Sequence, residues 1–161
     1  MNTRPASTHK KVLLETRSGE LRRGFLNPRA LENDSTLELL DESSGLQSLP
    51  WSEVHAVWFV SDWDLPLPDR PRVFARRPRL QGLWIRLSFP DGDIIEGILP
   101  NNLLPTYAVG FLLTPPPLGG SPTRVFVPRS AVADARIVGV ISPPGGRRSL
   151  PPPPQPGLFS D

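Results

Sequence analysis

The chain has 161 residues and contains no cysteine and only two histidines. Without cysteine the protein cannot form a disulfide, use a thiol nucleophile or bind a metal through thiolates. No apolar run reaches the length of about 18 residues that a membrane-spanning helix needs, and residues 1–11 lack the apolar core of a signal peptide. These absences predict a cytoplasmic protein with no membrane association.

Motifs typical of enzymes are missing as well. The sequence has no Gly-x-Ser-x-Gly elbow, no phosphate-cradling glycine loop and no His-x-x-x-His pair. His9 lies in the polar N-terminal stretch, and His55 is expected as a partly exposed residue at the start of a strand. Asp91, Asp93 and Glu96 gather near one hairpin, but the turn accounts for Asp91 and strand alternation places Glu96 outward. The sequence therefore predicts a non-enzymatic protein with no catalytic residues, no metal and no cofactor.

Long helices are not expected, because 22 prolines interrupt most of the chain. A proline inside a helix costs about 3 kcal/mol. What is present instead is period-two alternation of apolar and polar side chains, for example in residues 12–16 and 85–89. Such alternation is typical of strands with one buried face, so the chain is predicted to be all-β.

Two stretches of the sequence resemble each other. Residues 12–26 align with residues 85–99, which places Gly19 on Gly92 and Gly24 on Gly97. At the same offset residues 36–40 fall on residues 109–113, and Leu40 therefore on Leu113. After an insertion in the second copy, Pro115 to Pro122, residues 49–54 align with residues 127–132. This collinear series predicts an internal duplication.

Each copy is about fifty residues long and predicts five short strands. Gly19 and Gly92 are expected in hairpin turns, and Gly24 and Gly97 at bends inside the second strands. A bent second strand allows a short sheet to curl and close. We therefore predict two tandem small five-stranded SH3-like or Sm-like barrels, which pack on each other because each alone buries little apolar surface.

The predicted domain organisation follows from composition. Polar residues at the start and the proline-rich composition of the end favour disorder, since neither can bury a core. The expected segments are a disordered N-terminus (1–9), a first barrel (10–60), a Pro/Arg-rich connector (61–81), a second barrel (82–141) and a disordered proline-rich tail (142–161).

Positive charge is concentrated in the connector. The first barrel has six basic and eight acidic residues and the second has four of each. Neither therefore predicts the basic face of a nucleic-acid-binding protein. The connector arginines are the candidate ligand-binding residues, for an anion or a nucleotide; the alternative is a solvated linker paired with its own aspartates. The five candidates are Arg70, Arg72, Arg76, Arg77 and Arg79.

Several segments together resemble a known family. Residues 91–97, 110–116 and 124–128 are similar to the second half, and residues 54–63 to the end of the first half, of a bacterial family of unknown function, common in acidobacteria. The resemblance covers about residues 11–141 and departs in the loop at residues 117–122. It implies tandem small β-barrels and no particular activity.

Three functions are compatible with this sequence. The first is an interaction or adaptor module that contacts another protein through barrel faces or edge strands. The second is an Sm-like nucleic-acid-binding protein, which the charge distribution does not favour. The third is a PilZ-like cyclic-dinucleotide receptor, because Arg72 and Arg76 have an Arg-x-x-x-Arg spacing. The oligomeric state stays open.

Overall fold

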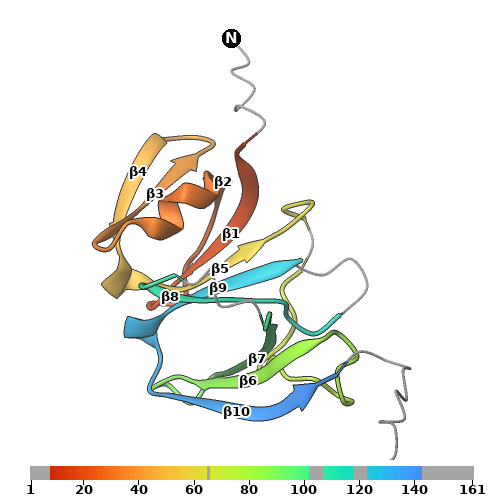
Figure 1. Ribbon diagram of the computed structural model, residues 1–161. Coiled ribbons are helices and arrows are strands. Elements are labelled where there is room, and N and C mark those ends of the chain that lie inside the picture. Colours follow the sequence, from red (N-terminus) through yellow and green to blue (C-terminus); the bar gives the residue numbers. More distant parts are fainter. Residues whose placement is uncertain (1–7, 65, 102–106, 118–122, 143–161) are drawn as a thin grey trace, which may run out of the picture.

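The computed structural model describes residues 8–64, 66–101, 107–117 and 123–142. The described residues form ten β-strands and three short 3-10 turns, and every pairing between the strands is antiparallel, which confirms the all-β prediction (Figure 1). Nearly all of the predicted disordered N-terminus and proline-rich tail lie outside the described residues. The longest helical element described, η1 (Pro28–Glu32), has five residues, and no described helix is long and apolar enough to cross a membrane.

Seven strands form the larger sheet and three the smaller one. The order in the larger sheet is β4-β3-β2-β1-β5-β9-β8, and in the smaller β10-β6-β7. An isolated bridge between Ile98 and Thr114 connects the two sheets. The strands are β1 (Lys10–Thr16), β2 (Leu21–Leu26), β3 (Thr36–Asp41), β4 (Gly45–Pro50), β5 (Val54–Phe59), β6 (Gly82–Ser88), β7 (Ile94–Leu99), β8 (Gly110–Leu113), β9 (Arg124–Pro128) and β10 (Asp134–Ile141).

The described sheets are not closed into two separate barrels. Instead β5 from the first half pairs with β9 from the second, with Val57 opposite Phe126. Val54, Val57 and Trp58 of β5 are all buried although they lie on both faces of the strand. A strand that is covered on both faces is typical of the middle of a sheet.

Corresponding pairings occur in the two halves. The hairpin β1–β2 corresponds to β6–β7, β3–β4 to β8–β9, and β1–β5 to β6–β10. In each half a proline, Pro50 or Pro128, precedes a three-residue 3-10 turn, η2 (Trp51–Glu53) or η3 (Arg129–Ala131). The hairpin glycines have the positive φ that their turns require, 90° at Gly19 and 88° at Gly92.

The second pair of aligned glycines, Gly24 and Gly97, lies where a neighbouring strand comes close. A Cβ at Gly24 would lie 2.7 Å from Cδ1 of Leu39, and one at Gly97 would lie 2.6 Å from Cβ of Leu113. Both glycines therefore allow the next strand to approach closely. This equivalence of Leu39 with Leu113 corrects the sequence alignment, which placed Leu40 on Leu113. The alignment was wrong by one position because both strands contain adjacent leucines, and only the fold shows which leucine faces the glycine.

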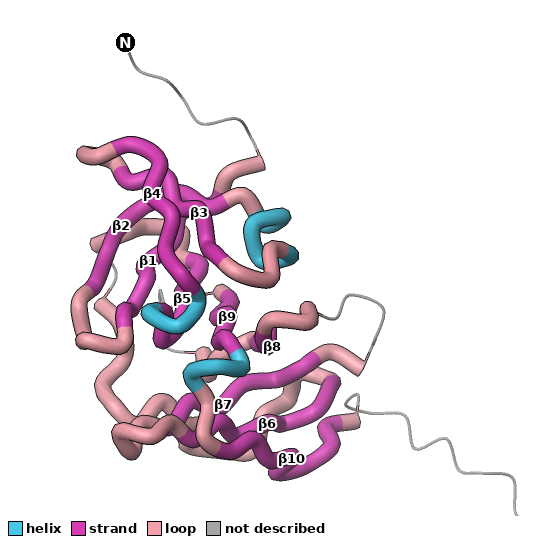
Figure 2. Tube along the Cα trace, turned by 90° about the vertical axis from the view of Figure 1, so that its left-hand side faces the viewer, coloured by secondary structure: helices cyan, strands magenta, loops and turns pink. Residues whose placement is uncertain are grey.

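The two halves share their hydrophobic cores. One core contains Leu13 and Trp58 from the first half together with Leu87 and Ile95 from the second. The other core lies mainly in the first half but includes Phe126 of β9. Figure 2 shows β5 and β9 running side by side between the other strands of the two halves. This shared burial agrees with the expectation that the two copies pack on each other.

Candidate functional site

The connector between β5 and β6 is partly built into the smaller sheet. The N–H of Arg72 donates to the carbonyl of Ile94, and the N–H of Glu96 donates to the carbonyl of Arg72, both at 2.9 Å. Arg72 thereby pairs in parallel with Ile95 beside β7. The connector is therefore not a solvated linker at this point, and its side chains are placed by the sheet.

The side chain of Arg72 is buried in an ion pair with Glu15 of β1. Trp58 Nε1 donates to the same carboxylate oxygen at 2.7 Å, and Arg70 Nη2 donates to the other oxygen at 2.8 Å. The guanidinium of Arg72 also lies over the ring of Trp58, 4.7 Å from its centroid. Both oxygens of the buried carboxylate are thus hydrogen-bonded, which is the condition for a stable buried charge.

A second buried pair, His55 and Asp93, lies close to Arg70. His55 Nε2 is 2.9 Å from Asp93 Oδ2, and the imidazole stacks on Phe89 with a centroid distance of 4.0 Å. Both side chains are buried, so the expectation that His55 is partly exposed was wrong. The reason is that Phe89 and the hairpin at Asp91 cover β5 from the other half.

Asp91, next to this pair, has a lowered pKa. The N–H of Asp93 donates to Asp91 Oδ1 at 3.0 Å, and this hydrogen bond, assisted by the nearby His55 and Arg70, favours the carboxylate form. Arg70 Nη1 lies 3.5 Å from Asp91 Oδ2. Asp91 and Asp93 of this hairpin therefore both contact Arg70 of the connector. Among the described residues no group of three or more histidine, aspartate or glutamate side chains is placed to hold a metal ion.

Glu96 of β7 holds the next part of the connector. Its Oε1 accepts from the N–H of Phe74 at 2.9 Å, and its Oε2 accepts from Trp84 Nε1 at 3.1 Å and Arg86 Nε at 3.2 Å. The residue is 1% exposed. The prediction that Glu96 points outward was wrong, because the connector covers the face of β7 that alternation leaves to solvent.

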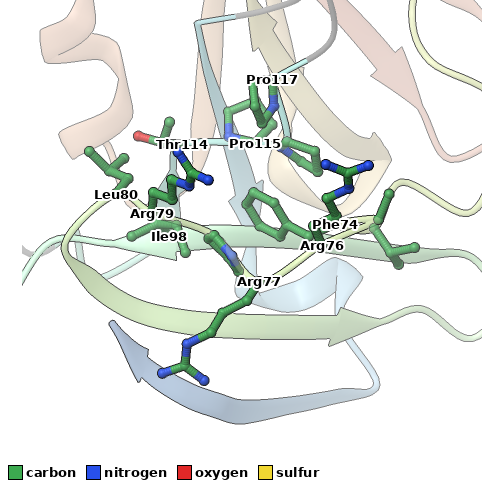
Figure 3. A pocket seen from close by; sticks show the side chains of 13 residues that line it. Phe74, Arg76, Arg77, Arg79, Leu80, Ile98, Thr114, Pro115 and Pro117 are labelled. Atoms are coloured by element: carbon green, nitrogen blue, oxygen red, sulfur yellow. The ribbon is translucent and has the colours of Figure 1, made fainter. Parts of the chain in front are cut away.

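Beyond Phe74 the connector forms one wall of an open pocket of about 600 Å³. The opposite wall is Thr114 to Pro117, at the start of the loop that is longer in the second half, and Ile98 of β7 lies between the two walls (Figure 3). The lining side chains are apolar except for one threonine and three arginines. The connector residues that line the pocket are Val73, Phe74, Ala75, Arg76, Arg77, Pro78, Arg79 and Leu80.

The three pocket arginines are exposed but differ in their contacts. Arg77 Nη2 donates to the carbonyl of Val140 at 3.1 Å. Arg76 and Arg79 make no ion pair with any carboxylate in the part of the chain that the structure describes. In Figure 3 they lie on either side of Phe74, whereas Arg77 points away toward β10. Two guanidinium groups are therefore available beside an apolar surface.

The five arginines predicted as ligand-binding residues thus separate into two groups. Arg70 and Arg72 are engaged by Glu15, while Arg76, Arg77 and Arg79 line the pocket. Sequence reasoning missed Glu15 and Glu96 as the residues that fix the connector. The only available signal was the apolar character of the connector itself, with Trp63, Leu67 and Phe74 among its prolines, since such residues are unusual in a free linker.

A family model described as a family of unknown function (DUF6982) matches residues 8–139. No curated protein and no solved structure matches this chain.

Proposed function

We propose that this chain, which belongs to the family DUF6982 of unknown function, is a non-enzymatic interaction module built as a tandem pair of SH3-like units. Its pocket binds an acidic extended segment of a partner protein. The single observation that carries this proposal is the placement of Arg76 and Arg79 beside the apolar surface of Phe74, Ile98 and Pro115.

Charge and shape favour this class of ligand. An aromatic or aliphatic anchor fits an apolar surface, and carboxylates next to the anchor can each accept charge-assisted hydrogen bonds from a guanidinium. The volume of about 600 Å³ lies within the usual range of ligand pockets. Both walls come from features that the two halves do not share, the connector and the enlarged loop.

The described residues that line the pocket include no general base that could activate the Thr114 hydroxyl as a nucleophile. No carboxylate, histidine or tyrosine is among its lining residues, and arginine stays protonated at physiological pH. The buried pair of His55 and Asp93 does not line it. This composition supports binding without chemistry.

The alternatives require other contacts. A cyclic-dinucleotide receptor that grips its ligand with an Arg-x-x-x-Arg pair would need Arg72, whose guanidinium is engaged by Glu15 and stacked on Trp58. A nucleic-acid-binding surface would need more basic residues than the pocket supplies. Both alternatives can be tested beside the proposal with the same protein.

The test is fluorescence anisotropy with a labelled peptide, Glu-Asp-Phe-Asp-Glu, and its charge-reversed form, Lys-Arg-Phe-Arg-Lys. We expect saturable binding of the acidic peptide only, weakened by salt. The double change Arg76→Gln and Arg79→Gln should lower the affinity about tenfold or more, since each charge-assisted hydrogen bond contributes on the order of 1.5–3 kcal/mol. Arg29→Gln, at an exposed arginine on η1, is the matched control.

Two results would contradict the proposal. One is equal binding of the two peptides, or none at concentrations of about 1 mM. The other is that cyclic-di-GMP or single-stranded RNA binds, that the double change Arg76→Gln and Arg79→Gln abolishes this binding, and that the acidic peptide does not displace the bound nucleotide or RNA. In that case the nucleotide or nucleic-acid function would replace the interaction module.

A further inference from the structure

The last strand of each half has a different environment. β5 and β10 both pair with the first strand of their own half, β1 and β6. β5 has β9 as a second neighbour and is almost fully buried, whereas β10 has no second neighbour among the described residues. Its side chains are left largely exposed, at 63% for Ile137, 40% for Val138 and 57% for Val140. A long apolar edge strand of this kind is a template for pairing with another strand.

The fourth strand of each half shows the same asymmetry. β9 pairs with β5, whereas the corresponding strand β4 has an outer edge that no described residue pairs with. Leu46 of β4 is 68% exposed, and it and Ile137 are the two most exposed large apolar residues in the described part of the chain. Within the described part of the chain, one last strand, β10, and one fourth strand, β4, therefore have a single neighbouring strand each.

The internal β5–β9 pairing supplies a register for these two edges. In that pairing Phe59 lies opposite Arg124. Phe59 corresponds to Ile137, because Phe59 pairs with Val12 of β1 and Ile137 pairs with Ile85, the residue of β6 that aligns with Val12. Arg124 corresponds to Leu46, because each stands four residues before the proline, Pro128 or Pro50, that precedes the 3-10 turn. The register thus places Ile137 opposite Leu46.

We propose that β10 pairs with β4 of a second copy of this chain, antiparallel and in the register of β5 with β9. The two edges lie at opposite ends of the molecule, so the contact is head-to-tail and leaves one edge free on each copy (Figure 1). Such a contact closes into a ring or continues as a fibre, according to the rotation between copies. This inference does not depend on ligand binding in the pocket.

The neighbouring pairs in this register are compatible. Arg136 falls opposite Gln47 and Ala135 opposite Ser48, so no like charges face each other. Apolar residues opposite one another, as Ile137 and Leu46 are here, are a stabilising cross-strand pair. The bulge of β10 lies after Ile137 and does not interrupt these three pairs.

The test uses two single variants, Ile137→Asp and Leu46→Asp, in analytical ultracentrifugation over a range of concentrations. Both side chains are exposed, so neither change should affect folding. We expect the unchanged chain to form assemblies that grow with concentration, and each variant alone to be monomeric. Mixed in equal amounts, the two variants should form dimers and nothing larger, because one supplies an intact β4 edge and the other an intact β10 edge. Leu21→Asp, at another exposed leucine, is the control and should assemble like the unchanged chain.

Other outcomes overturn the proposal. A monomeric unchanged chain at all concentrations shows that the edges do not pair. Self-association of Leu46→Asp alone points to pairing of β10 with β10, and excludes β4 as its partner. A mixture of the two variants that stays monomeric excludes the head-to-tail contact.

Discussion

Arg72 of the connector and Glu15 of β1, 57 positions apart in the chain, form an ion pair whose side chains are 5% and 3% exposed. This pair joins the connector to β1, the first strand of the first half. Since Arg72 is also paired through its backbone with β7, the same residue contacts both halves of the molecule. The first half, the connector and the second half are therefore expected to unfold as one unit.

Removing one partner of this ion pair should strongly destabilise the protein. We expect Arg72→Met to lower the free energy of unfolding by about 3–5 kcal/mol, because the Glu15 carboxylate is then left buried without its main counter-charge. The double variant Arg72→Met with Glu15→Leu should recover much of the loss, since no buried charge remains. Urea denaturation followed by tryptophan fluorescence measures both values. A loss below about 1 kcal/mol for Arg72→Met would show that the pair is not buried in solution.

The close approach at Gly97 gives a second prediction. Gly97→Ala would place a methyl group 2.6 Å from Cβ of Leu113 and 3.1 Å from the carbonyl of Thr114, so we expect a loss of about 1–3 kcal/mol in stability. The control is Gly139→Ala, whose methyl would meet only Cε3 of Trp84 at 3.7 Å, and which should change stability by about 0.5 kcal/mol or less. Equal effects of the two substitutions in thermal denaturation would contradict the close approach of Leu113 to Gly97.

Glu96 is expected both to stabilise the fold and to hold the pocket residue Phe74 in place. In Glu96→Gln the side-chain NH2 must face either the N–H of Phe74 or the donors of Trp84 and Arg86, and we expect a loss of about 1–3 kcal/mol. The NH2 is expected to face Phe74, because the other orientation would oppose two donors, one of them a charged guanidinium. Phe74 then loses its anchor, so the acidic peptide should also bind more weakly. Glu38→Gln, at an exposed position of β3, is the control for both measurements. Unchanged peptide affinity in Glu96→Gln would show that Phe74 is positioned without this hydrogen bond.

The strands were predictable from the sequence, and the buried charges were not. Alternation in residues 12–16 and 85–89 and the turn glycines Gly19 and Gly92 are local signals, and local signals determine hairpins. The burial of Glu15 and Glu96 depends on a connector that lies far away in the chain, and alternation within one strand cannot show what covers its outer face. The shared sheet was missed for the same kind of reason, since pairing of β5 with β9 leaves no local pattern.

The sequence pointed to the connector arginines as candidates, but not to their individual surroundings. The arginine cluster of the connector was visible as a composition feature, and three of its members do line a pocket. Whether a connector arginine can contact a ligand depends on its partners in other elements, above all on Glu15, which engages Arg70 and Arg72. A count of charges by segment cannot distinguish a buried guanidinium from an exposed one.

Asp41, the last residue of β3, gives a prediction for pH dependence. Hydrogen bonds from the hydroxyl and the N–H of Ser43, and from the N–H of Ser44, lower the pKa of Asp41 from 3.8 to about 2. A lowered pKa in the folded state means that this carboxylate contributes stability above pH 3.8, which is lost as the pH falls toward 2. An NMR titration should find the low pKa in the unchanged chain and a value nearer 3.8 in Ser43→Ala. The same pKa in both proteins would contradict the turn geometry.

The central claim is that residues 73–80 of the connector form a binding site, whereas Arg70 and Arg72 are engaged by Glu15. An NMR titration with the Glu-Asp-Phe-Asp-Glu peptide tests this claim most directly. We expect saturable shifts in the backbone amides of residues 73–80, Ile98 and Thr114, with little change at Arg72 and Glu15. Shifts concentrated on β10 or spread over the first half, or none at saturating peptide, would contradict it.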